Sequence, residues 1–90
     1  MKALQLRYVA AAYPITSKLD EEFKTTASSI QELIKELDDV YGGFLEMFIN
    51  EESGKLNLNT MIYYGEKGKV PVAVLDIDQA ITDGARITFW

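Results

Sequence analysis

Residues 29–41 read Ser-Ile-Gln-Glu-Leu-Ile-Lys-Glu-Leu-Asp-Asp-Val-Tyr and carry the strongest local signal in the chain. Apolar residues recur in them at i, i+3, i+4 and i+7, the spacing of an amphipathic helix with one buried face. Ser29 and Glu32 form the capping-box pattern of a helix N-terminus. Gly42 and Gly43 follow, and glycines tolerate the positive φ angles that helix ends require. The sequence therefore predicts a helix over residues 29–41.

Two segments before this helix are predicted to be strands. Residues 3–8 alternate apolar and polar side chains with period two, which is typical of a strand with one buried face. Residues 18–26 are charged and roughly alternating, which suits an edge strand because charge discourages edge-to-edge aggregation. Between them, the step from Tyr13 to Pro14 disfavours helix. Residues 9–17 are therefore expected to form a loop or a frayed strand end.

The segments after the helix are predicted to complete a sheet. Residues 44–49 are compatible with a short second helical turn. Residues 58–64 are rich in β-branched and aromatic side chains and favour a strand. Residues 70–75 resume the extended pattern, and Pro71 confines them to a sheet edge or a strand start. A tight Asp-Gly turn then precedes a final strand at residues 86–90.

The predicted order of elements is β-β-α-β-β-β. One amphipathic helix flanked by hairpins indicates an α+β fold, with the main helix across one face of a mixed sheet of four to five strands. A chain of 90 residues, 48% of them hydrophobic, has material for one core but not for two. Residues 1–90 are therefore expected to form a single domain.

The amino-acid composition argues against several classes of function. The chain contains neither cysteine nor histidine, so it offers no thiolate or imidazole for nucleophilic attack, metal binding or proton transfer near neutral pH. Asp76, Asp78 and Asp83 are interpreted as turn residues rather than cation ligands, because no ligand-rich loop surrounds them. An enzyme would depend on Asp, Glu, Lys or Tyr, and no pair of these stands at a persuasive spacing. We expect no catalytic residue, no cofactor and no metal site.

The charge and hydropathy indicate a soluble protein with protein partners. A net charge of −5 and a pI near 4.6 oppose nucleic-acid binding, since phosphate contacts need a basic surface. The acidity would instead steer the domain toward a basic surface of a partner. The longest apolar runs fall far short of the roughly 18 to 20 residues of a membrane span, and the N-terminus lacks a signal-peptide pattern. We expect a cytoplasmic protein that binds neither nucleic acid nor membrane.

Several local patterns follow one another in the order found in one family of small proteins. They are the helix at residues 30–37, the polar turn at residues 51–55 and the strand at residues 60–64. Residues 80–89, Ala-Ile-Thr-Asp-Gly-Ala-Arg-Ile-Thr-Phe, close the chain with an Asp-Gly turn and a strand. In these features the chain resembles the MoaD/ThiS family, the small subunit of molybdopterin synthase and the thiamine sulfur carrier. The resemblance implies a ubiquitin-like β-grasp fold.

The C-terminus departs from that family. Its members end in a flexible tail with a terminal Gly-Gly, whose carboxylate is adenylated and converted to a thiocarboxylate. This sequence ends at Trp90, and the internal pair Gly42 and Gly43 has no free carboxylate. Two hypotheses follow. The chain is a non-enzymatic interaction module related to sulfur carriers and unable to carry sulfur as it stands, or it is a genuine sulfur carrier of molybdopterin or thiamine biosynthesis whose Gly-Gly is absent from this sequence.

The last strand supplies the candidate binding residues. Alternation places Ile87 and Phe89 on one face and Arg86, Thr88 and Trp90 on the other. In the resembling family, an exposed hydrophobic residue just before the tail docks on the activating enzyme, and Trp90 occupies that position. We predict that these three outward residues bind a protein partner of the activating-enzyme or large-subunit kind. The alternative is that Trp90 folds back over the sheet edge or packs in a homodimer, and the oligomeric state stays open.

Overall fold

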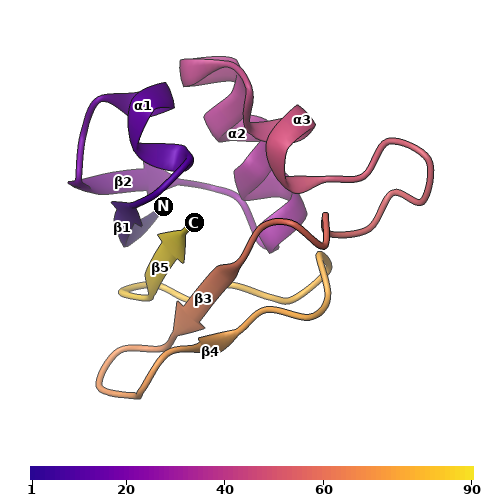
Figure 1. Ribbon diagram of the computed structural model, residues 1–90. Coiled ribbons are helices and arrows are strands. Elements are labelled where there is room, and N and C mark those ends of the chain that lie inside the picture. Colours follow the sequence, from indigo (N-terminus) through magenta and orange to yellow (C-terminus); the bar gives the residue numbers. More distant parts are fainter.

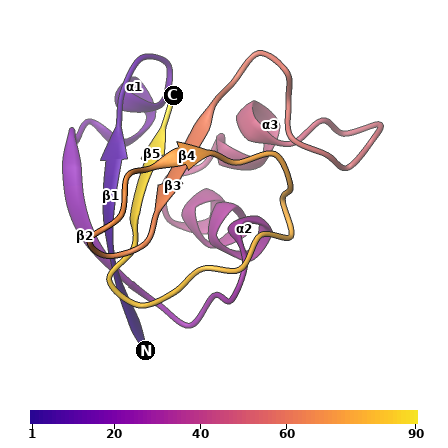
Figure 2. The same ribbon diagram turned by 90° about the horizontal axis from the view of Figure 1, so that it is seen from below.

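The computed structural model describes residues 1–90. Its elements are β1 (Lys2–Tyr8), α1 (Ala12–Thr16), β2 (Asp20–Thr25), α2 (Ile30–Tyr41), α3 (Phe44–Phe48), β3 (Ile62–Gly65), β4 (Val72–Ala73) and β5 (Arg86–Phe89). The strands form one sheet in the order β2-β1-β5-β3-β4. Only β1 and β5 pair in parallel, and the other pairs are antiparallel. The helices lie on one side of this sheet and leave its other face open (Figures 1 and 2). The expected α+β fold with a mixed sheet is confirmed.

The parallel pair β1 and β5 forms the centre of the sheet. Its register places Leu6 beside Ile87 and Tyr8 beside Phe89, and all four side chains are buried. They belong to the same core as the buried face of α2, which consists of Ile30, Leu33, Ile34 and Leu37. Burial of an apolar side chain of this size contributes about 1.5–3 kcal/mol. The packing of α2 onto this strand pair therefore contributes substantially to stability.

The ends of α2 follow the sequence prediction. The Ser29 hydroxyl accepts a hydrogen bond from the Glu32 N–H at 3.2 Å, and the Glu32 carboxylate accepts one from the Ser28 N–H at 3.0 Å. The first bond satisfies an N–H group that the helix itself leaves free, and the second fixes the residue before the N-cap to the first turn. At the other end, Gly42 and Gly43 have φ angles of 79° and 80°. They turn the chain directly into α3, the predicted second helical turn.

The structure corrects the prediction for residues 9–17. The segment contains the short helix α1, with Ala12 and Thr16 buried. Pro14 lies in the first turn of α1, where a backbone N–H has no acceptor within the helix, so proline removes no hydrogen bond. Ser17 ends the helix with a φ of 57°. The burial of two side chains outweighs the local preference of the residue before proline.

The strand predicted at residues 58–64 also begins later than expected. The Thr60 N–H and hydroxyl both donate to the carbonyl oxygen of Asn57, at 3.2 and 3.0 Å. These bonds close a turn, leave Leu58 98% exposed and delay β3 to Ile62. The predicted strands at both sheet edges are present as β2 and β4, although β4 is reduced to two residues beside Pro71. No helix of the protein combines the length and apolarity that crossing a membrane would take.

Candidate partner-binding face of the sheet

One face of the sheet has no helix over it, and we call it the open face. Strand register sets its side chains in rows, with Gln5 beside Arg86 and Arg7 beside Thr88 across the β1–β5 pair. On the other side of β5, Tyr63 of β3 lies beside Thr88. The inward neighbours on these strands are buried, whereas Gln5, Arg7 and Arg86 are exposed. The open face therefore joins polar residues from opposite ends of the chain.

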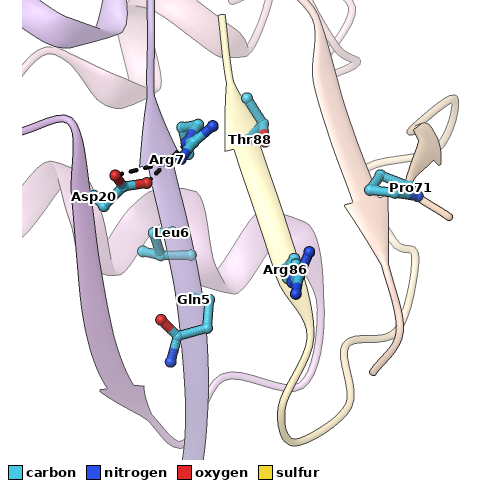
Figure 3. A pocket seen from close by; sticks show the side chains of 7 residues that line it. All are labelled: Gln5, Leu6, Arg7, Asp20, Pro71, Arg86 and Thr88. Carbon is cyan, nitrogen blue, oxygen red and sulfur yellow. Dashed lines mark hydrogen bonds and ion pairs between the residues drawn. The ribbon is translucent and has the colours of Figure 1, made fainter. Parts of the chain in front are cut away.

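A groove of about 640 Å³ crosses the open face (Figure 3). Its walls come from β1, β2, β5 and the segment before β4, and the lining residues are Gln5, Leu6, Arg7, Asp20, Pro71, Arg86 and Thr88. Two of the three predicted binding residues, Arg86 and Thr88, line it. The alternation of residues 3–8 already placed Gln5 and Arg7 on the polar face. Their position beside β5 required knowledge of the parallel pairing, which no local pattern provides.

The two arginines of the groove differ in their partners. The Arg7 Nε donates to Asp20 Oδ1 at 2.8 Å, and Arg7 Nη2 to Asp20 Oδ2 at 3.4 Å. This hydrogen bond and the charge of Asp20 raise the pKa of Arg7 above its ordinary value. Arg86 makes neither a side-chain hydrogen bond nor an ion pair. Figure 3 shows it apart from the Arg7–Asp20 pair. The groove therefore holds one neutralised and one uncompensated guanidinium.

Trp90 continues the line of β5 at one end of the open face. Its N–H donates to the Met61 carbonyl oxygen at 2.9 Å, so the backbone follows the sheet beyond Phe89. The indole packs edge-on against Tyr63, with ring centroids 6.3 Å apart and planes at 67°. Trp90 remains 47% exposed and Met61 45% exposed. We call Met61, Tyr63 and Trp90 the aromatic end of the open face.

A second polar cluster lies on the covered side of the sheet, around Glu21. Its Oε2 accepts hydrogen bonds from the Tyr8 and Tyr41 hydroxyls at 2.5 and 2.6 Å, and its Oε1 accepts one from Lys18 Nζ at 3.3 Å. Burial alone would raise the pKa of Glu21, but the bonds from Tyr41, Tyr8 and Lys18 together hold it below its ordinary value. Burial and the bond to Glu21 raise the pKa of Tyr8. These bonds tie β1, β2 and α2 together, which gives Glu21 a structural role.

The three aspartates considered as cation ligands lie in turns. Asp76 Oδ1 accepts the Asp78 N–H at 2.9 Å, which is the usual role of aspartate in a tight turn. Asp83 Oδ1 accepts the Ala3 N–H at 2.7 Å, and the Gly84 N–H donates to the Ala3 carbonyl oxygen at 2.9 Å. The Asp-Gly turn is thereby fixed to the start of β1. It sets the register in which β5 enters the sheet.

The chain matches no model of a known protein family, and no curated protein matches its sequence at a significant level. Solved structures match it over nearly its whole length. The solution structure of the Haloferax volcanii protein HVO 2177 has a TM-score of 0.75 and 17% identity, covering 98% of this chain and 80% of its own. Small archaeal modifier protein 1 of H. volcanii has a TM-score of 0.72 and 9% identity, covering 99% and 95%.

A third solved structure is a candidate molybdopterin converting factor, subunit 1, from Pyrococcus furiosus. Its TM-score is 0.68 at 16% identity, and the match covers 99% of this chain and 95% of the other. Together these likenesses show that the chain has the ubiquitin-like β-grasp fold. The fold expected from the resemblance to the MoaD/ThiS family is confirmed.

Proposed function

We propose that this chain is a cytoplasmic ubiquitin-like protein of the sulfur-carrier or modifier type. It acts without catalysis of its own, as an interaction module that binds a protein partner through Arg86, Thr88 and Trp90 on the open face. The observation that carries the proposal is this face, where β5 carries an uncompensated arginine and the residue directly after this strand is a half-exposed tryptophan. The fold shared with a small archaeal modifier protein and a candidate molybdopterin converting factor subunit supports the carrier or modifier type.

The physical properties of the face favour a protein partner. Tryptophan, tyrosine and arginine are the side chains enriched at the energetic centres of protein interfaces. Trp90 and Tyr63 already pack against each other, so a partner would meet a preformed aromatic surface and would lose little entropy in ordering it. The opposite face of the sheet is occupied by the helices. The open face is therefore the sheet surface available for docking.

The proposal is tested by replacing Trp90 with Ala in an N-terminally tagged chain. Partners recovered from native cells are identified, and their affinities are measured for wild type and variant. Loss of an interface centre of this kind costs about 2 kcal/mol or more, or roughly thirtyfold in affinity. Val40→Ala is the matched control, because Val40 is 57% exposed on α2, on the opposite side of the sheet. Undiminished affinity of the Trp90→Ala variant for every partner would refute the proposal.

A second candidate is a genuine sulfur carrier of molybdenum cofactor or thiamine biosynthesis. It is favoured by the whole-chain match to the candidate molybdopterin converting factor subunit. In that case the native protein extends past Trp90 to a Gly-Gly that an activating enzyme adenylates. Intact-mass measurement of the protein isolated from native cells decides between the two. A terminal Gly-Gly carrying sulfur in place of one carboxylate oxygen supports the carrier, and a native chain without Gly-Gly excludes it.

A further inference from the structure

The hydrogen-bond donors around Arg86 have no acceptors within the protein. Arg86 is exposed and unpaired, as described above, and the Gln5 amide and Thr88 hydroxyl beside it make no side-chain hydrogen bond either. All three line the same groove. A guanidinium next to an amide and a hydroxyl is a donor set that suits an anionic oxygen ligand, since a carboxylate accepts two parallel bonds from arginine.

Pro71 packs directly on the glycine that lies beside Arg86. Gly65 of β3 pairs with Arg86, and a Cβ on Gly65 would lie 3.0 Å from the Pro71 Cα. Pro71 therefore occupies the space over Gly65 and forms an apolar wall of the groove beside Arg86. A ligand in the groove would therefore contact both the Arg86 guanidinium and this apolar wall.

The distribution of charge distinguishes the open face from the rest of the molecule. Helices α2 and α3 carry one cation, Lys35, against five carboxylates: Glu32, Glu36, Asp38, Asp39 and Glu46. The outward positions of the strands carry three cations, Arg7, Lys24 and Arg86, against the carboxylates of Asp20 and Glu22. The net charge of −5 thus belongs mainly to the helical side. An acidic group is repelled there and accepted on the open face.

We infer, on the basis of the proposed function, that Arg86 binds the carboxylate of an Asp or Glu in an extended segment of the partner protein. The segment lies along β5 and packs an apolar side chain on the aromatic end. Arg86, Thr88 and Trp90 recur at alternate positions, so the arginine and the indole stand about 13 Å apart along the strand. An acidic and an aromatic residue four positions apart in an extended segment match this spacing. Thr88, which lines the groove, pairs with Tyr63 of the aromatic end. An apolar surface therefore lies beside the groove, which suits a side chain of a macromolecule better than a free anion.

The inference is tested with a synthetic peptide and the full chain. The probe is an acetylated nonapeptide with Glu and Phe four positions apart. The control peptide has the same sequence with Gln in place of Glu. NMR titration is expected to shift the Arg86 Nε–H, the Thr88 amide and the Trp90 indole N–H with the Glu peptide. The Gln peptide is expected to bind at least about tenfold more weakly. The Arg86→Ala variant should bind the Glu peptide more weakly than wild type by the same factor. Arg86→Lys should lose part of that affinity, because lysine cannot form the two parallel bonds.

Controls separate this contact from general electrostatics. Lys35→Ala removes the same charge from α2 and is expected to leave peptide binding unchanged. Equal binding of the Glu and Gln peptides, or no binding of either, overturns the inference. Inorganic phosphate that shifts the same signals while the peptide does not would assign the groove to a free anion and also overturn it. If the peptide does not bind while Trp90→Ala still loses its cellular partner, only the inference about Arg86 is refuted. If Trp90→Ala still binds every partner, the proposed function itself is refuted.

Discussion

Among single residues, Glu21 shows how a charged side chain of an edge strand becomes structural. The acidic run of residues 20–22 suits a solvated edge, and Asp20 and Glu22 do lie outward. Glu21 points to the covered side and collects three donors from three different segments. Period-two alternation predicts that Glu21 differs in face from its neighbours. It cannot predict that Tyr8 and Tyr41 lie within reach, because α2 brings the second of these from 20 residues away.

The lowered pKa of Glu21 predicts a loss of stability in acid. The folded protein binds this proton less tightly than the unfolded chain does, so the contribution is complete above the ordinary carboxyl pKa. It is lost as the pH falls through the lowered pKa of the folded state. The free energy of unfolding, measured with urea over a pH series, should therefore decline on the acid side. Glu21→Gln should lower stability at neutral pH and flatten that decline.

The neighbouring residue provides the control for this measurement. Glu22→Gln removes one carboxylate from the same strand at an exposed outward position and should change stability by no more than about 0.5 kcal/mol. Equal pH profiles for wild type and Glu21→Gln would show that the cluster contributes nothing. An equal loss of stability in Glu21→Gln and Glu22→Gln would assign the effect to the general charge of β2 rather than to the bonds around Glu21.

At the scale of elements, the cap of α2 can be tested directly. Ser29→Ala removes the acceptor of the Glu32 N–H and should cost about 1 kcal/mol of stability. Ser28→Ala is the matched change one position earlier. It removes an exposed hydroxyl that donates to the Glu32 carboxylate at 3.2 Å. It keeps the bond from the Ser28 backbone N–H to that carboxylate and leaves the Glu32 N–H capped by Ser29, so its cost should be smaller. Urea denaturation of the two variants checks the order, and a larger loss in Ser28→Ala would contradict the assignment of the cap to Ser29.

The elements that the sequence predicts are those whose signals are local. Helix α2 carries its own cap and its own apolar stripe, and β1 and β5 alternate, so each is correctly placed. Helix α1 depends on the burial of Ala12 and Thr16 against the rest of the fold, which outweighs the preference of the residue before Pro14. The start of β3 depends on a turn closed by Thr60. The predicted residues Arg86, Thr88 and Trp90 share the expected face, whereas the groove with Gln5 and Arg7 arises from a parallel pairing across most of the chain.

For the whole molecule, one aromatic cluster joins the sheet to the helices beneath the open face. Phe44 of α3 packs at 5.9 Å from Tyr8, 5.5 Å from Phe89 and 5.6 Å from Phe48, as ring-centroid distances. These residues are fully buried. Tyr8 and Phe89 belong to the central strands that carry Arg7 and Thr88 on their outward side. The core therefore supports from behind the strands that line the groove.

Replacement of Phe44 tests this support. Phe44→Ala should cost about 3–5 kcal/mol through lost burial and an internal cavity, a large part of the roughly 5–15 kcal/mol that stabilises a typical domain. Phe44→Leu should cost about 1–2 kcal/mol, since it keeps most of the volume and loses the aromatic contacts. Phe44→Leu is expected to remain folded, and in it the NMR signals of Arg7 and Thr88 should broaden because their strands are less firmly held. Leu58→Ala should alter neither stability nor these signals. Unchanged outward signals in a destabilised Phe44→Leu variant would show that the sheet holds the groove without help from the aromatic cluster.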